Sequence, residues 1–214
     1  MMEKSLRRIG IMGGTFDPIH NAHLALADCA LKSLQLDEIW FLPAAVPYLD
    51  KHAVSPFSDR LRMTELAVTD RKQFRVSDIE GERTGNTYTA DTLRILKERC
   101  QNTEFHFILG ADQLYSLESW HEIEVIFQLA VLTAAEREQT GRTDRQSFQE
   151  RIKYLQERYR ARIERLPFPE MDISSTEIRQ RAAAGKELQG LVPDAVRDYI
   201  LNNKLYQTKT IRQE

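Results

Sequence analysis

Short apolar segments alternate with longer amphipathic segments along the whole chain, and this alternation constrains the fold more than any other feature. The run EIWFL at 38–42 is typical of a strand that is buried on both faces of a parallel sheet. The other expected strands are 8–12, 74–79, 104–109 and 129–133, with a short edge element at Leu166 and Phe168. The expected helices are 21–35, 57–69, 88–99, two short ones within 111–127, then 146–163, 175–184 and 194–203. The pattern predicts an α/β fold, a Rossmann-like doubly wound parallel sheet with helices on both faces and right-handed crossovers.

Composition bounds the number of domains and the classes of partner. The 214 residues contain no repeat, low-complexity tract or linker, so we expect a single domain over 1–214. A formal net charge of −2 gives no general attraction to nucleic acid or to an anionic membrane. The sequence has no apolar run of about eighteen residues and no signal-peptide core, so neither a membrane span nor export is expected. Cys29 and Cys100 have no CxxC spacing and are interpreted as small core residues in a reducing cytoplasm.

The segment 10–23, GIMGGTFDPIHNAH, follows the first strand and opens a helix. Gly13 and Gly14 lack a Cβ, which allows a tight turn and a close approach of the backbone to a ligand. His20 and His23 lie at the helix start, where unpaired N–H groups and the helix dipole favour an anion. The alternatives are two ordinary polar histidines or a metal pair, although no third ligand of matching spacing is nearby. We interpret the segment as a site where a phosphate undergoes chemistry.

A second candidate anion site is ISSTEIR at 173–179, just before another expected helix. Ser174, Ser175 and Thr176 offer hydroxyl and backbone N–H groups at the helix start, and Arg179 follows one turn later. The alternative is an ordinary helix cap, because Ser or Thr followed by Glu is typical of caps.

Two further polar clusters follow expected strands, where ligands of parallel sheets bind. Gly110 and Asp112 end the strand 104–109, and Trp120 follows; Asp112 is suited to accept from ribose hydroxyls and Trp120 to stack on a flat ring. The segment Thr87, Tyr88 and Thr89 supplies short donors for a carboxylate or an amide. A strand end, a helix cap and a core tryptophan are the structural alternatives.

These strings together resemble one known family. GGTFDPIHNAH is similar to the signature of the His-x-x-His nucleotidyltransferases, and ISSTEIR to a second signature of the same group. TYTADTL and GADQLYSLESW resemble patterns of the bacterial nicotinate-nucleotide adenylyltransferases. The resemblance covers nearly the whole chain except about 137–166. It implies transfer of adenylyl from ATP to nicotinate mononucleotide, giving nicotinate adenine dinucleotide (deamido-NAD) and pyrophosphate in NAD biosynthesis.

The resemblance also implies roles for single residues. The catalytic set is His20, His23 and Arg179. The ATP and phosphate set is Gly13, Gly14, Thr15, Phe16, Ser174, Ser175, Thr176, Lys51, Gly110 and Asp112. The mononucleotide set is Thr87, Tyr88, Thr89, Trp120 and Arg137. Mg²⁺ is expected to bind mainly through the ATP phosphates, without a dedicated protein metal site.

The sequence departs from the family pattern at three places. Ala22 replaces a usual glycine, Lys51 is displaced by one position after the second strand, and Arg137 is the only counterpart of a usual basic pair. A homo-oligomer is left open, and neither nucleic acid nor membrane is expected as a partner. The rival readings are adenylyl transfer to another phosphomonoester, such as phosphopantetheine, or a non-catalytic relative that binds adenine nucleotides or RNA.

The segment 137–166 is a divergent, Arg-rich helical stretch. A basic helix can bind RNA. Glutamates are interleaved with the arginines, however, and apolar residues recur at helical spacing, which favours an amphipathic helix packed on the sheet or on a partner subunit. The recurring residues are Phe148, Ile152, Leu155, Tyr159 and Ile163.

Overall fold

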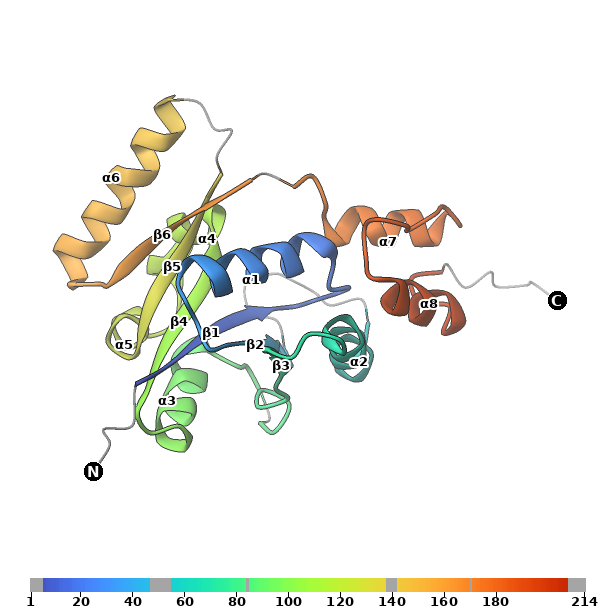
Figure 1. Ribbon diagram of the computed structural model, residues 1–214, viewed down its shortest axis with the longest axis horizontal. Helices are drawn as coiled ribbons and strands as arrows, with labels where there is room; N and C mark the ends of the chain where they lie inside the picture. The colour runs from blue at the N-terminus through green and yellow to red at the C-terminus, as the bar shows by residue number, and fades with distance from the viewer. Residues whose placement is uncertain (1–5, 47–54, 84, 138–141, 170, 208–214) are drawn as a thin grey trace.

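A single six-stranded sheet forms the centre of the molecule (Figure 1). The computed structural model describes residues 6–46, 55–83, 85–137, 142–169 and 171–207. The strands are β1 (Arg7–Gly14), β2 (Glu38–Pro43), β3 (Phe74–Val76), β4 (Thr103–Gly110), β5 (Ala130–Arg137) and β6 (Ile163–Phe168). All neighbouring strands pair in parallel, in the order β3-β2-β1-β4-β5-β6. The order reverses at β1, since β2 lies on one side of it and β4 on the other, so ligands are expected at the carboxyl end of β1.

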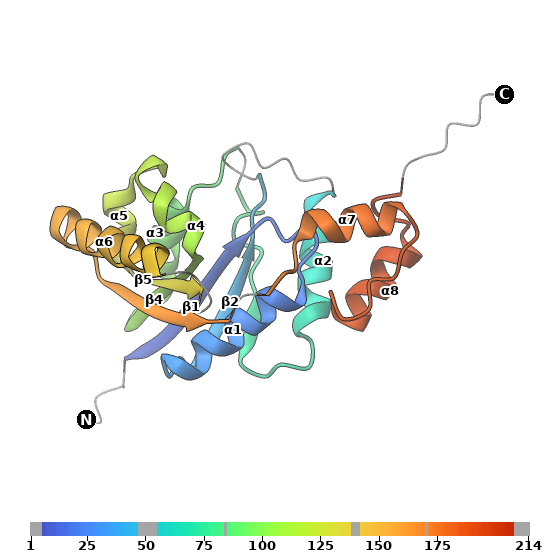
Figure 2. The same cartoon turned by 90° about the horizontal axis from the view of Figure 1, so that it is seen from above.

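Helices cover both faces of the sheet, as the alternation predicted (Figure 2). One face carries α1 (Asn21–Ser33), α2 (Phe57–Val68), α7 (Ser175–Ala183) and α8 (Asp194–Asn202). The other face carries α3 (Thr89–Arg99), α4 (Ala111–Ser116), the 3₁₀ turn η1 (Leu117–Ser119), α5 (Ile123–Leu129) and α6 (Arg142–Tyr159). The doubly wound α/β fold is therefore confirmed. None of the described helices is long and apolar enough to cross a membrane.

The central strands are apolar on both sides because each side packs against helices. In β4, Phe105 and Phe107 belong to the core beneath α3 and α5, whereas Ile108 belongs to the core beneath α1. In β1, Ile9 and Ile11 face the first of these cores. Side chains of a strand alternate between faces, so a strand between two helical layers becomes a continuous apolar run.

Several predicted boundaries were wrong, among them the start of the helix predicted at 146, which is Arg142, and the end of the strand predicted at 133, which is Arg137. The helix predicted for 146–163 is α6, which ends at Tyr159, and Ile163 begins the edge strand β6. Arg160 adopts φ +54°, a left-handed conformation that ends the helix. The strand predicted to reach residue 79 ends at Val76, and the residue at 129 closes α5 rather than opening β5.

The apolar stripe of α6 packs on the sheet, which is the interpretation favoured from the sequence. Phe148, Ile152 and Leu155 are buried in the same core as β4 and β5. Tyr159 packs against that core as well. The apolar face of α6 thus packs against β4 and β5.

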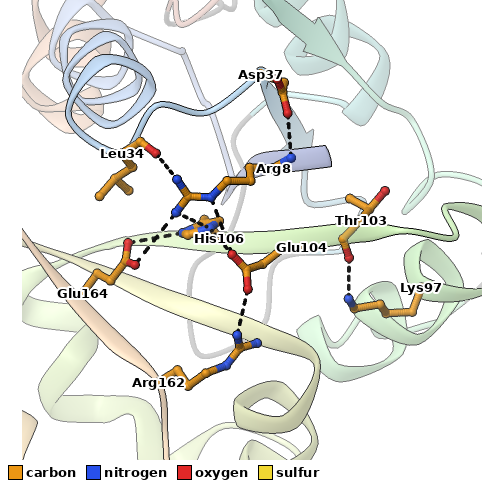
Figure 3. Close-up of polar contacts among 9 residues, drawn as sticks. All are labelled: Arg8, Leu34, Asp37, Lys97, Thr103, Glu104, His106, Arg162 and Glu164. Atoms are coloured by element: carbon orange, nitrogen blue, oxygen red, sulfur yellow. Dashed lines mark hydrogen bonds and ion pairs between the residues drawn. The ribbon is translucent and has the colours of Figure 1, made fainter. Parts of the chain in front are cut away.

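A group of charged side chains lies at the amino-terminal side of the sheet, away from the carboxyl ends of the strands (Figure 3). His106 of β4 is fully buried and lies 3.1 Å from Glu104 and 3.4 Å from Glu164 of β6. Arg8 lies within 3.3 Å of the same imidazole and donates to the carbonyl of Leu34 just after α1. Burial has the largest influence on His106 and lowers its pKa, although both carboxylates act in the opposite direction. The contacts of this group connect the end of α1 to strands β1, β4 and β6.

Candidate active site

The two histidines of the first motif lie at the start of α1, immediately after the turn that follows β1. His20 is the residue before the helix, and its backbone N–H donates to Nδ1 of His23 over 3.2 Å. An imidazole whose Nδ1 accepts a hydrogen bond carries its proton on Nε2 when it is neutral. The two rings stack, with centroids 3.6 Å apart and planes 24° from parallel. The backbone thus fixes His23 as an Nε2–H donor and holds His20 against it.

His20 is held in its neutral form by burial. Its side chain is 6% exposed, and Nδ1 has no hydrogen-bond partner among the residues that the structure describes. Burial lowers its pKa to about 4, so the ring is uncharged at neutral pH. At neutral pH His20 is therefore an N–H donor rather than a fixed positive charge.

The lowered pKa of His20 makes stability dependent on pH. The unfolded chain binds a proton below about pH 6.5, whereas the folded chain keeps His20 neutral down to about pH 4. This contribution is complete above pH 6.5 and is lost as the pH falls toward 4. Between pH 6.5 and 4, we expect the free energy of unfolding measured with urea to fall by roughly 3 kcal/mol more for the wild type than for His20→Asn. Parallel pH profiles of the two proteins would contradict this.

The start of α7 touches the segment that leads into α1. Oγ of Ser175 donates to the carbonyl of Pro18 over 2.9 Å, and Nη1 of Arg179 donates to the carbonyl of Asp17 over 2.8 Å. Ser174 caps the helix, since its Oγ accepts from the N–H of Glu177. Two motifs more than 150 residues apart in sequence (|i−j| = 157 and 162) are thereby joined by direct hydrogen bonds.

These two motifs enclose a cavity of about 600 Å³, which we call the Ser175 cavity. Its walls contain most of the residues predicted to bind the ATP phosphates, together with His23 and Arg179. The predicted residues among them are Gly13, Gly14, Thr15, Phe16, Gly110, Asp112, Ser175 and Thr176. The lining combines a helix start, an imidazole and a guanidinium, which is a chemical environment suited to a polyanion.

A second cavity of about 370 Å³, the Trp120 cavity, is lined by the same glycine pair, which lies at the end of β1. Its lining also includes four of the five residues that were predicted to hold the mononucleotide: Thr87, Tyr88, Thr89 and Trp120. The indole N–H of Trp120 is buried and has no hydrogen-bond partner in the described part of the chain. A donor of this kind in a cavity wall is available to an acceptor on a ligand.

The remaining predicted residues are placed differently. Ser174 caps α7, and the ring of His20 stacks on that of His23; neither residue is among those lining the two cavities. Lys51 lies outside the described residues. Arg137 ends β5, where its backbone pairs with Phe168, and its side chain is not described.

Four residues that the sequence did not single out contribute to the site. Gln113 lines both cavities and accepts the N–H of Gly110 over 3.1 Å. Glu80 and His121 line the Trp120 cavity, where the ring of His121 lies 4.2 Å from that of Tyr88. Arg60 is buried beneath the loops around the cavities. The strings GADQ and EGERTGN contain two of these residues and were the available signal.

A doubly wound sheet with a glycine turn, imidazoles and a second helix start at its switch point is characteristic of nucleotide-binding α/β enzymes. The family model described as "Cytidylyltransferase-like" matches residues 11–181. A probable nicotinate-nucleotide adenylyltransferase of Lachnoclostridium phytofermentans is 43% identical, covering 94% of this chain and all of that protein. A second one, from Dehalococcoides mccartyi, is 44% identical over 94% of this chain and 98% of that protein. The chain belongs to the nicotinate-nucleotide adenylyltransferases of the cytidylyltransferase-like family.

Solved structures support the fold independently. Plasmodium falciparum nicotinic acid mononucleotide adenylyltransferase complexed with NaAD superposes with a TM-score of 0.75 at 24% identity. The match covers 94% of this chain and 97% of that one. A putative nicotinate-nucleotide adenylyltransferase of Vibrio parahaemolyticus gives a TM-score of 0.64 at 17% identity.

Proposed function

We propose that this protein transfers the adenylyl group of ATP to nicotinate mononucleotide, releasing pyrophosphate and forming nicotinate adenine dinucleotide. The observation that carries the proposal is the arrangement of the two cavities, which share Gly13, Gly14, Thr15 and Gln113 as a common floor. With one substrate in each cavity, the phosphates of the two substrates meet beside Gly13 and Gly14, which have no side chains. The family of the chain favours this reaction over transfer to phosphopantetheine and over a role without turnover.

The reaction requires positioning and charge stabilisation rather than a general base. An oxygen of the mononucleotide phosphate, already ionised at neutral pH, attacks the α-phosphorus of ATP. The bond from that phosphorus to the bridging oxygen breaks, and pyrophosphate leaves with the electron pair. His23, which lines the Ser175 cavity, donates a hydrogen bond to the α- or β-phosphate as negative charge builds there, and His20, whose ring stacks on that of His23, is the second donor of this proposal. Arg179 and the N–H groups at the start of α7 hold the β- and γ-phosphates.

The donor set fits a Mg²⁺ ion that arrives with ATP. Among the described residues no group of three His, Cys, Asp or Glu side chains is arranged to hold a metal ion. Mg²⁺ keeps several waters and often binds through substrate phosphates, so few protein ligands are needed. Asp112 lines the Ser175 cavity and would hold water molecules of such an ion, whereas both carboxylate oxygens of Asp17 already accept hydrogen bonds from Ser55 and Tyr206. The bound ion would neutralise phosphate charge.

We propose that the protein works in the reducing cytoplasm. Cys29 and Cys100 are both free thiols, as expected for a cytoplasmic enzyme of NAD biosynthesis. Its partners are the two nucleotide substrates.

A substrate panel tests the proposal and its selectivity. The Trp120 cavity is lined by Trp120, whose buried indole N–H has no hydrogen-bond partner in the described part of the chain, and by Thr89; the hydroxyl of Thr87 donates to the carbonyl of Val46. A carboxylate accepts from such donors, whereas the NH₂ of an amide would face them unpaired. We expect pyrophosphate release with ATP, Mg²⁺ and nicotinate mononucleotide, and a kcat/KM at least about tenfold lower with the nicotinamide analogue.

Phosphopantetheine is the control acceptor in this panel. Equal rates with the acid and the amide would show that the pocket assignment is wrong, and turnover only with phosphopantetheine would overturn the proposed substrate.

A further inference from the structure

Arg60 of α2 is a buried arginine that belongs to neither cavity wall. Its side chain is 1% exposed, and no carboxylate of the described residues lies within ion-pair distance of its guanidinium. A buried arginine normally pairs with an acid, because burying a charge without partners is costly. Asp17 and Glu80 lie near enough to favour the charged guanidinium electrostatically, but its direct partners must be other groups.

Backbone carbonyls supply that compensation. Nε donates to Ser55 O over 3.2 Å, and Nη1 donates to Thr15 O over 2.8 Å and to Ala44 O over 2.7 Å. Nη2 donates to Ala45 O over 3.2 Å. The four carbonyls come from three separate segments: the turn after β1, the segment after β2, and the residues before α2.

These segments form the cavities. Thr15 lines both cavities, and Ala44 lines the Trp120 cavity. The N–H of Ala44 also donates to the carbonyl of Gly14 over 2.8 Å, which joins the same two segments directly. Ser55 in turn donates its N–H to Asp17, whose carbonyl accepts from Arg179. The guanidinium thus fixes the floor shared by both cavities relative to the wall of one of them.

We propose that Arg60 is a positioning residue for adenylyl transfer, setting the distance between the two substrates through the four carbonyls that it holds. The inference rests on the proposed function. The planar guanidinium supplies five donors in a fixed fork, whereas a lysine supplies three donors from one point. Lysine therefore keeps the charge and cannot hold the three segments in the same relative position. A small displacement of bound reactants affects turnover strongly and affects the binding of each substrate alone much less.

The test uses Arg60→Lys and Arg60→Met in the full chain, with Arg62→Lys and Arg62→Met as matched controls. Arg62 lies on the same helix, its side chain is 54% exposed, and its ion pair is with Glu65. At a temperature where circular dichroism shows the proteins folded, we expect both Arg60 variants to lose about thirtyfold in kcat, with KM for ATP changed less than about threefold. The Arg62 variants should stay within about twofold of the wild type in both parameters.

Other outcomes would overturn the proposal. Arg60 variants that fold and keep kcat within about threefold of the wild type, with only a lower Tm, would assign the residue to stability. Failure of both variants to fold would assign it to the fold alone.

The wild type tests the proposed function separately in the same assay. If it forms no dinucleotide, calorimetry decides on Arg60. Variants that bind each substrate alone normally but no longer bind the mononucleotide to the ATP-loaded protein support positioning, and unchanged binding of the mononucleotide to the ATP-loaded protein overturns it.

Discussion

His20→Ala is expected to lower kcat about a hundredfold, corresponding to roughly 3 kcal/mol for the loss of one well-aimed donor to developing charge. The expected change in Tm is only a few degrees. Nδ1 of His20 has no partner in the described residues, so removing the ring breaks no hydrogen bond of Nδ1 in the resting protein. Steady-state kinetics and thermal unfolding of the same preparation give the two numbers.

His106→Ala is the matched control for this variant. His106 is also buried, but it lies in the charged group at the opposite side of the sheet, where it contacts Glu104 and Glu164. Its removal should lower Tm and leave kcat near the wild-type value. A His20→Ala protein that loses activity only in proportion to its loss of folded material would show that His20 is structural.

Arg179→Ala is expected to lower kcat/KM for ATP about a hundredfold, because a charge-assisted hydrogen bond to phosphate contributes up to roughly 3 kcal/mol. The same guanidinium donates to the carbonyl of Asp17 and to Oγ1 of Thr176. Arg179→Lys keeps the charge but not the fork that makes both bonds, so it should recover only part of the loss. Binding of ATP by calorimetry and kcat/KM at varied ATP measure the effect.

Arg181 offers the control within the same helix. Its side chain is 42% exposed and pairs with Glu177, away from the Ser175 cavity. Arg181→Ala and Arg181→Lys should change kcat/KM less than about twofold. Arg179→Ala with unchanged ATP binding and turnover would remove Arg179 from the phosphate site.

The sequence was sufficient for the fold and for most of the site because both depend on local patterns. Strands buried on both faces appear as apolar runs, and parallel topology places the segments after them at one edge. Topology placed the segment around His23 at that edge, and the family resemblance assigned the segment around Ser175 to the same site. Hydrogen bonds from Ser175 and Arg179 join the two segments in the structure. The roles assigned to the individual site residues remain predictions.

What the sequence did not reveal depends on long-range contacts. Arg60 lies in an amphipathic helix near the exposed Arg62, and only the fold shows that Arg60 is buried beneath three segments. Glu80 is likewise buried in a way that only the fold shows. Burial raises its pKa, and its hydrogen-bond partner Thr92 lies in another element. The end of α6 was missed because a left-handed arginine at 160 has no local signal comparable to that of a glycine.

The common glycine floor has a consequence for how the enzyme would be inhibited. Gly13 and Gly14 place no side chain between the cavities, which also share Thr15 and Gln113, so we expect that one molecule can bind across both of them. The dinucleotide formed there would occupy both cavities, and it would have to be released before either substrate could bind again. Synthetic compounds that link an adenosine to a pyridine through a short chain would, for the same reason, displace both substrates at once.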